Sequence, residues 1–258
     1  MMSRKFSHSA LAMGVILLAA CSDPKPEATT TTPEPATSAP ESIAATEAVT
    51  DNTLTTPEMP VAEPNPAANQ QFVEGQDYQL AKNPSSVEKP DMIEVREFFW
   101  YGCGHCYNLE SYTSNWLKTK PADVNFVRTP AAMNPVWEQN ARGYYAVDLM
   151  GKMTPELHEA LFDEIHQRSQ KIFDQKSLAS FYAGHGIDQA KFDGLYNSFA
   201  VNAKVSQSKN LATRYQLSGV PSIIVNGKYI VGGDGQKVVQ VVNYLVDQER
   251  QRLAKPQS

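Results

Sequence analysis

Two cysteines, two residues apart, stand where a strand-like run of the chain changes into a helix-like one. Cys103 and Cys106 belong to the stretch FFWYGCGHCYNLE, residues 98–110. Residues 92–101 are rich in β-branched and aromatic side chains and predict a buried strand, whereas residues 107–118 contain no Gly or Pro and predict a helix. The chain must therefore turn from strand to helix at the cysteine pair.

The remaining pattern extends this unit into a larger α/β fold. Asn226-Gly227 stands between two apolar runs, and this dipeptide favours a two-residue hairpin because both turn positions need a positive φ. The other expected elements are a strand at 124–128, helices at 135–152, 154–168, 175–183 and 188–216, hairpin strands within 220–231, and a final helix at 238–253. This order predicts an α/β sheet with an inserted helical subdomain at about 134–217.

The N-terminus indicates export and a lipid anchor. Two basic residues precede an apolar run that is too short to span a membrane, so residues 1–20 are predicted to be a signal peptide. The sequence LAAC, ending at Cys21, resembles the lipobox of bacterial lipoproteins, in which the cysteine is lipidated. An ordinary cleavage site beside a chance cysteine is the alternative. Lipidation of Cys21 would consume the odd thiol of the three and leave Cys103 and Cys106 as a pair.

Residues 21–68 are predicted to be a lipidated cysteine followed by a disordered tether. The segment 22–68 is rich in Thr, Ala, Pro and Glu and holds nine of the 17 prolines and no aromatic residue, so it cannot bury enough apolar surface to fold. Its eight acidic residues and one lysine leave residues 69–258 formally neutral within a chain of net charge −5. We therefore expect a folded domain at 69–258 and no nucleic-acid partner.

The cysteine pair has three interpretations. Structural zinc needs four ligands, and neither a second cysteine pair nor suitably spaced histidines accompany this one, so no metal is expected. A structural disulfide would close a very small loop and would stabilise little. A redox centre is favoured, because a helix N-terminus stabilises a thiolate and protonated His105, between the cysteines, adds a cation. Cys103 is then expected on the rim and Cys106 inside the first helical turn.

The motif FFWYGCGHCY, the helical insertion and the stretch GVPSIIVNGKY at 219–229 together resemble the DsbA family of periplasmic thiol:disulfide oxidoreductases. The resemblance covers about residues 72–258. It implies a thioredoxin-like fold and disulfide exchange through the cysteine pair, with no cofactor. The dipeptide Gly104-His105 is that of protein disulfide isomerase, whereas the best-known DsbA proteins have Pro-His, so the oxidising strength stays open.

The resemblance also implies roles for individual residues. Cys103 matches the nucleophile that bonds to the substrate, and Cys106 matches the resolving cysteine. Val220-Pro221 matches a cis-proline loop that offers backbone hydrogen bonds to a substrate peptide, with a trans proline at a strand start as the alternative. Glu97 matches a buried acid that accepts a proton from the resolving thiol, with an exposed strand carboxylate as the alternative.

Signals outside these motifs add little. The family's lysine partner of the buried acid would align near Pro121, beside Lys120, so that ion pair is expected to be shifted or absent. His158 and His166 lack the spacing of zinc ligands and are interpreted as solvated helix residues. The stretch GGDG at 232–235 lacks a phosphate-loop signature and is interpreted as a strand-to-helix turn.

Together these features predict a periplasmic, lipid-anchored thiol:disulfide oxidoreductase that donates the Cys103–Cys106 disulfide to reduced exported proteins. The resemblance implies reoxidation by a membrane partner of the DsbB type. We expect a monomer held at the membrane through Cys21. One alternative is a disulfide isomerase or reductase of the same fold, although the polar tether offers no dimerisation domain. The other is a non-catalytic lipoprotein binding module whose cysteines are merely structural.

Overall fold

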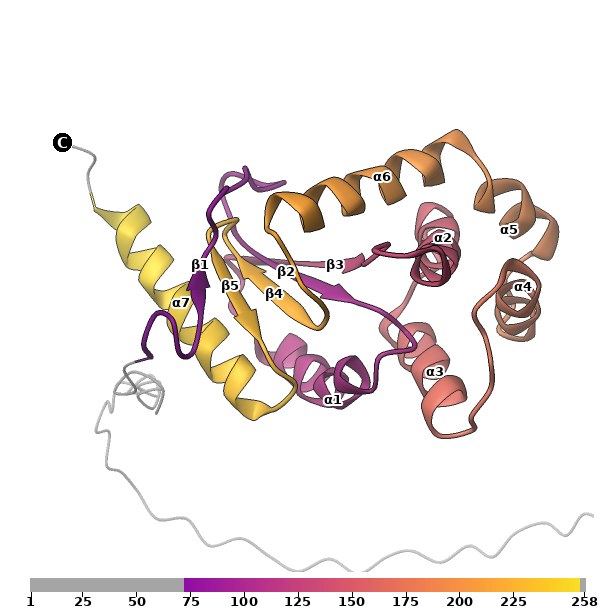
Figure 1. Cartoon of the computed structure of the whole chain (residues 1–258), viewed down its shortest axis with the longest axis horizontal. Coiled ribbons are helices and arrows are strands. Elements are labelled where there is room, and N and C mark those ends of the chain that lie inside the picture. Colours follow the sequence, from indigo (N-terminus) through magenta and orange to yellow (C-terminus); the bar gives the residue numbers. More distant parts are fainter. Residues whose placement is uncertain (1–71, 256–258) are drawn as a thin grey trace, which may run out of the picture. The chain divides into compact units, whose positions relative to one another are not determined.

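A mixed five-stranded sheet forms the centre of residues 72–255, the part of the chain that this computed structural model describes (Figure 1). The strand order is β1-β5-β4-β2-β3, in which β2 and β3 are parallel and the other neighbours are antiparallel. The strands are β1 (Gln79–Leu80), β2 (Ile93–Phe99), β3 (Val124–Pro130), β4 (Ser222–Val225) and β5 (Tyr229–Gly232).

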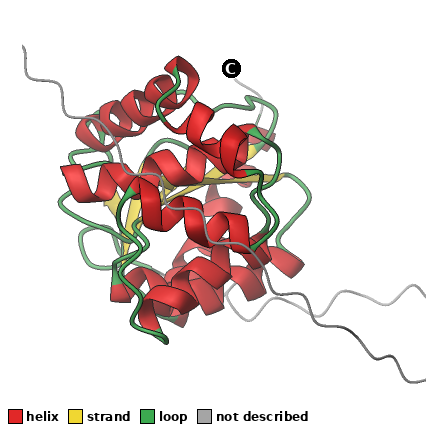
Figure 2. Cartoon of the chain, turned by 90° about the vertical axis from the view of Figure 1, so that its right-hand side faces the viewer, coloured by secondary structure: helices red, strands yellow, loops and turns green. Residues whose placement is uncertain are grey.

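Seven helices complete the described part of the chain. Helix α1 connects the parallel strands β2 and β3, helices α2 to α6 follow one another between β3 and β4, and α7 comes last. Figure 2, viewed from the side of this helical insertion, shows helices covering most of the strands. The helices are α1 (Gly104–Thr119), α2 (Pro135–Leu149), α3 (Pro155–His166), α4 (Gln175–Gly184), α5 (Gln189–Tyr196), α6 (Phe199–Arg214) and α7 (Gln236–Ala254). The predicted α/β fold with an inserted helical region is confirmed.

Strand β2 is the centre of the core, and all seven of its residues are buried. Because successive side chains of a strand point to opposite faces, Ile93 and Val95 pack in the cluster that contains Leu245 of α7. Phe98 packs on the other face with Tyr215, just after α6. Three charged residues of this strand are buried as well, and buried charges need partners. The sheet therefore holds a set of paired charges at its centre.

The hairpin prediction is confirmed. Asn226, Gly227 and Lys228 join β4 to β5, and the first two have φ values of 48° and 68°, the positive values that the predicted Asn-Gly turn requires. A Cβ at Gly227 would also overlap the backbone carbonyl of Ser85. Glycine is thus required at this position for two independent reasons.

The prediction of one helix over residues 188–216 was wrong. The chain forms α5 and α6 instead, because Asn197 ends the first of them. The side chain of Ser198 then caps the second by accepting a hydrogen bond from the backbone N–H of Val201 at 3.2 Å. The short edge strand β1 was not predicted at all.

Within residues 72–255, no helix combines the length and the apolar character needed to cross a bilayer. The predicted signal peptide at 1–20 and the tether at 21–68, with Cys21, lie outside the described residues.

Candidate active site

The turn between β2 and α1 places both cysteines at the start of a helix. Cys103 is the N-cap residue, and its sulfur accepts a hydrogen bond from the backbone N–H of Cys106 at 3.3 Å. Both residues are free thiols in this structure, Cys103 partly exposed and Cys106 fully buried. The expected arrangement, with one cysteine on the rim and one inside the first turn, is confirmed.

The surroundings of the two sulfurs move their pKa values apart. A hydrogen bond from the Cys106 thiol lowers the pKa of Cys103 to about 6, and backbone N–H groups and the charge of His105 add to this effect against partial burial. Burial raises the pKa of Cys106, and the neighbouring Cys103 raises it further. At neutral pH Cys103 is therefore the thiolate and Cys106 the protonated thiol.

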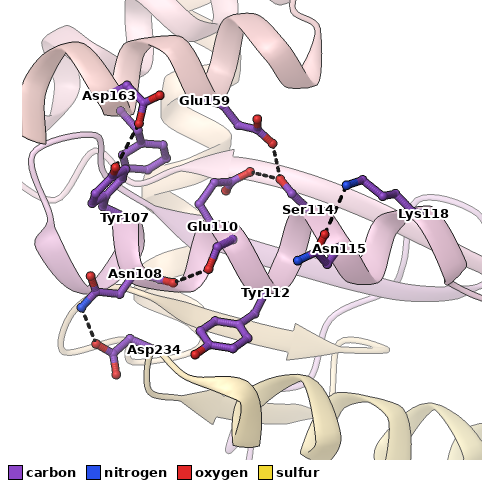
Figure 3. Close-up of a pocket in the computed structure, with 12 residues that line it drawn as sticks. Tyr107, Asn108, Glu110, Tyr112, Ser114, Asn115, Lys118, Glu159, Asp163 and Asp234 are labelled. Carbon is purple, nitrogen blue, oxygen red and sulfur yellow. Dashed lines mark hydrogen bonds between the residues drawn. The ribbon is translucent and has the colours of Figure 1, made fainter. Parts of the chain in front are cut away.

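His105 does not stand alone beside these sulfurs. Its imidazole is 76% exposed, and its Nδ1 lies 2.8 Å from a carboxylate oxygen of Asp234, in the turn between β5 and α7. The amide of Asn108 donates to the same oxygen at 3.2 Å, a contact drawn in Figure 3. The bond with Asp234 raises the pKa of His105 and lowers that of Asp234. Sequence reasoning assigned Asp234 only to a turn and missed this contact.

The loop before β4 lies against the turn between β2 and α1 that carries Cys103, called the redox turn below. The Val220–Pro221 peptide bond is cis, as the family resemblance implies, so the trans alternative is excluded. The Cys103 Sγ lies 3.4 Å from the carbonyl oxygen of Val220, to which it can donate only while it is protonated. A loop more than 110 residues away in the chain thus presents its backbone at the exposed sulfur.

The Trp100 indole ties the redox turn to the helical insertion. A Cβ at Gly102 would overlap the Trp100 ring, so this ring fills the space beneath the turn. The indole stacks on Trp137 of α2, with ring centroids 4.9 Å apart, and its Nε1 donates to the side-chain oxygen of Asn140 at 2.8 Å. By contrast, a Cβ at Gly104 would meet no atom within 4 Å.

A buried acid and a buried cation lie within the sheet next to this turn. Glu97 is 1% exposed, which excludes the exposed alternative, and its Oε2 lies 3.6 Å from the Nε of Arg128 on β3. Arg128 also donates to Glu110 of α1 at 2.5 Å. Burial and the charge of Glu110 raise the pKa of Glu97 to about 8, although Arg128 opposes them. The charge of Glu97 contributes in turn to the raised pKa of Cys106.

The expectation that the family's lysine partner of Glu97 is shifted or absent is confirmed. The cation beside Glu97 is Arg128 instead, because the parallel register of β2 and β3 sets these two residues side by side. Lys120 is engaged elsewhere, and its Nζ donates to the carbonyl oxygen of Val124 at 2.7 Å.

The interpretation of His158 and His166 as solvated residues was wrong. His158 is 1% exposed, and its two ring nitrogens lie 2.8 Å from the Tyr101 hydroxyl and 3.3 Å from Glu110. His166 donates to the carbonyl oxygen of Tyr101 at 2.8 Å, and its ring stacks on Tyr107. Both histidines lie on the apolar face of α3, four residues to either side of Phe162. That spacing was the signal that could have identified them.

Burial and the charge of Arg128 lower the pKa of His158 to about 4, so the imidazole is neutral at pH 7. The Glu110 carboxylate can only accept, because its side-chain hydrogen bond to His158 and the charges around it lower its pKa in spite of burial. The Nε2 of His158 must therefore donate to Glu110, and the Nδ1 must accept from the Tyr101 hydroxyl. The hydrogen bonds of His158 thus connect α3 of the insertion to α1 and to the turn before it.

A cavity of about 680 Å³ lies beside α1 and α3, as Figure 3 shows. Its walls carry the carboxylates of Glu159, Asp163 and Asp234 and the amine of Lys118. Neither cysteine lines this cavity. Among residues 72–255, no three His, Cys, Asp or Glu side chains are grouped as metal ligands would be.

Comparisons with known proteins agree with this geometry. The family model described as a DSBA-like thioredoxin domain matches residues 94–242. The thiol:disulfide interchange protein DsbA of Azotobacter vinelandii is 41% identical over 168 residues, which cover 64% of this chain and 78% of that protein. Its counterpart from Pseudomonas aeruginosa is 38% identical over 183 residues, covering 69% of this chain and 86% of that protein.

Solved structures give the same result. The crystal structure of Pseudomonas aeruginosa DsbA has a TM-score of 0.67 at 37% identity and covers 71% of this chain and 97% of that chain. The crystal structure of DsbA from Xylella fastidiosa has a TM-score of 0.65 at 31% identity and covers 70% of this chain and 98% of that chain. With its redox turn, its cis-proline loop and its inserted helices, the chain belongs to the DsbA-like thioredoxin family.

Proposed function

We propose that this thiol:disulfide oxidoreductase donates a Cys103–Cys106 disulfide to reduced exported proteins. The observation that carries the proposal is the difference between the two sulfurs. Cys103 is partly exposed, caps the helix and has a pKa lowered to about 6, whereas Cys106 is buried and has a raised pKa. A stabilised Cys103 thiolate favours the dithiol form, so the disulfide form is an oxidant.

The exchange proceeds in two displacements. A substrate thiolate attacks the Cys103 sulfur, forms a mixed disulfide and displaces the sulfur of Cys106. A second substrate thiolate then attacks the substrate sulfur of this mixed disulfide and displaces the Cys103 thiolate. The substrate leaves with a new disulfide, and its two electrons remain on the dithiol protein. The low pKa of Cys103 makes it a good leaving group in the second step.

Glu97 serves the proton requirement of the buried cysteine. Cys106 leaves the disulfide as a thiolate of raised pKa and therefore takes up a proton. Glu97, with a pKa of about 8, is largely protonated at neutral pH and can supply this proton. In reoxidation the Glu97 carboxylate takes the proton back from the attacking Cys106 thiol. Arg128 keeps the charged state of Glu97 accessible by opposing the rise in its pKa.

The cis-proline loop and the Gly104-His105 dipeptide shape the surface that meets the substrate. The backbone of Val220 lies beside the Cys103 sulfur, where it can form hydrogen bonds with an extended substrate peptide. Pro221 fixes the course of this loop. Gly104 leaves open space above the turn, and His105 supplies a cation next to the thiolate.

Refolding assays test the proposal against an isomerase or reductase. The oxidised protein is expected to form disulfides in reduced RNase faster than it repairs scrambled RNase, and Cys103→Ser should abolish both activities. Faster repair than oxidation would assign the protein to the isomerase class. A Cys103 that reacts with iodoacetamide as slowly as an ordinary protonated thiol would instead favour a binding module.

We further propose that the protein is a periplasmic lipoprotein anchored through Cys21. The basic N-terminus, the LAAC sequence and the odd number of cysteines support this anchor. Anchoring would keep the redox centre close to a DsbB-type membrane reoxidase. In cells fed labelled palmitate, the wild-type protein should be labelled and sediment with membranes, whereas Cys21→Ser should be unlabelled and soluble. Gel filtration of the lipid-free domain would check the expected monomer.

A further inference from the structure

The turn between β5 and α7 makes a contact with the redox dipeptide that the exchange mechanism above does not use. Asp234 stands in this turn, 129 residues from His105 in sequence, and one of its carboxylate oxygens lies 2.8 Å from the Nδ1 of that imidazole. Asn108, on the first turns of α1, donates to the same oxygen at 3.2 Å (Figure 3). Two groups of the redox helix therefore converge on a single carboxylate from another element.

We propose that Asp234 is a positioning residue of the redox centre, which orients His105 and keeps its imidazole protonated beside the Cys103 thiolate. The inference rests on the proposed function and adds a residue to the site that performs it.

The geometry fixes the role of the His105 Nδ1 atom. A carboxylate can only accept, so the Nδ1 of His105 donates to Asp234, and the Nε2 points away from this bond. The charged groups that face the imidazole are Asp234, from the β5–α7 turn, and Cys103, from its own turn. Both are negative when ionised and both favour the imidazolium. Asp234 is the stronger of the two.

This pairing matters because of where the two neighbours titrate. The Cys103 thiolate forms above a pH of about 6. An ordinary imidazole, with a pKa of roughly 6.5, would lose its proton over nearly the same interval. The cation would then disappear as the thiolate forms. By raising the pKa of His105, Asp234 extends the pH range in which imidazolium and thiolate coexist.

The sign of the effect follows from which charge acts on the sulfur. The imidazolium of His105 lowers the pKa of Cys103 directly. The carboxylate of Asp234 acts on the imidazole and on Asn108. Asp234 therefore stabilises the thiolate through His105. Its own negative charge would have the opposite effect, since like charges disfavour ionisation.

The experiment equilibrates the full chain with glutathione redox buffers at pH 7.5 and pH 5.5. Asp234→Asn keeps an oxygen for the two hydrogen bonds but removes the charge. At pH 7.5 we expect its equilibrium to shift toward the disulfide by about 1.5- to 5-fold, the range for exposed ion pairs. At pH 5.5 the difference should shrink, because the imidazole is protonated without help. The NMR titration midpoint of His105 should fall in the same variant.

Three further variants test whether Asp234 acts on the Cys103 thiolate through His105. In a His105→Asn background, Asp234→Asn should no longer favour the disulfide at either pH. Asn108→Ala, which removes the second contact without changing a charge, should move the equilibrium in the same direction by less. Asp91→Asn makes the same charge change at an exposed residue before β2, at the opposite end of that strand, and should change nothing.

The inference is overturned if Asp234→Asn matches the wild type at pH 7.5, if its effect is equal at both pH values, or if the effect persists without His105. These outcomes differ from a failure of the proposed function. In that case the wild-type Cys103 would itself titrate like a free cysteine, whatever the residue at position 234.

Discussion

Glu97 of β2 and Arg128 of β3 are cross-strand partners in a parallel register, with their Oε2 and Nε atoms 3.6 Å apart. Within the described chain, neither of these two buried atoms has a hydrogen-bond partner. Arg128 gives another nitrogen to Glu110, so a single guanidinium serves two carboxylates. Glu97 is therefore stabilised only in part when ionised, which leaves its pKa near 8.

This arrangement predicts that ionising Glu97 destabilises the fold. Its pKa in the folded protein, about 8, is above the ordinary value of 4.5, so the stabilisation from the neutral form is complete below pH 4.5 and is lost as pH rises through about 8. Glu97→Gln should remove this loss and be more stable than wild type at pH 8 by a few kcal/mol, at ~1.4 kcal/mol per pH unit. Urea unfolding of the reduced protein at pH 4.5, 6 and 8 measures it. The exposed Glu74→Gln is the control, and equal slopes for both variants would contradict the account.

The thiol of Cys106 is predicted to act on Cys103 before any substrate arrives. Because its hydrogen bond is the largest cause of the lowered pKa of Cys103, Cys106→Ala should raise the Cys103 midpoint above about 6. Cys106→Ser keeps a donor and should raise it less. Absorbance of the thiolate at 240 nm, followed against pH, gives the midpoints. A midpoint that does not change in the alanine variant would show that the helix N-terminus alone determines it.

The same thiolate makes the stability of the dithiol form depend on pH. The pKa of Cys103 is lowered from an ordinary 9.0 to about 6, so the stabilisation is complete above pH 9.0 and is lost as pH falls through about 6. The dithiol form should gain stability over the disulfide form as pH rises within this interval. Unfolding of both forms at several pH values provides the comparison, and a constant difference would contradict the assignment.

His158 is predicted to be a structural link that is neutral at pH 7. His158→Phe keeps the ring shape but leaves the Tyr101 hydroxyl and the Oε2 atom of Glu110 without a partner, which costs about 1–3 kcal/mol for each unpaired group although Arg128 still pairs with the other oxygen of Glu110. The wild type should also lose stability as pH falls from 6.5 through about 4, because the folded state resists protonation of this imidazole. The variant should lack that loss. Thermal unfolding across this range tests it, with the exposed His185→Gln as the control.

Glu249 is predicted to stabilise the fold without affecting the thiol–disulfide equilibrium of Cys103 and Cys106. Its carboxylate is fully buried and accepts from Asn226 at 2.5 Å, Lys228 at 2.8 Å and Arg252 at 2.9 Å. Burial opposes ionisation, but these donors outweigh it and lower the pKa of Glu249 to about 2. The stabilisation is complete above pH 4.5 and is lost as pH falls through about 2.

Glu249→Gln should accordingly lower the free energy of unfolding at pH 7 by about 1.5–3 kcal/mol, the usual contribution of hydrogen bonds to a charged group. The hairpin turn that it holds is at the end of β4 away from Pro221, so the equilibrium with glutathione should not change. A shifted redox equilibrium would show that the two ends of the sheet are coupled.

Features set by neighbours in sequence could be predicted. The turn at Cys103 follows from an apolar run that meets a helix-compatible one, and the hairpin at Asn226 from a dipeptide that tolerates positive φ. The start of α3 likewise follows from local sequence, because Thr154 precedes a proline and its hydroxyl accepts from the backbone N–H of Leu157 at 3.2 Å. Each of these depends on a few consecutive residues.

Features set by tertiary contacts could not be predicted from the same patterns. Arg128 faces Glu97 only because two parallel strands adopt one register among several. Asp234 reaches His105 from a turn near the other end of the chain. His158 is the intermediate case, because its place on the apolar face of α3 could be seen but its buried partners, Tyr101 in the turn after β2 and Glu110 on α1, could not.

The Trp100 indole lies beneath Gly102 on one side and against Trp137 on the other, so the loop that carries Cys103 rests on the first helix of the insertion. A tilt of that helix relative to the sheet would carry Cys103 with it and change its separation from Val220. A movement of the helical insertion would therefore change the access of an incoming thiol to Cys103, because the Trp100 indole connects the two parts.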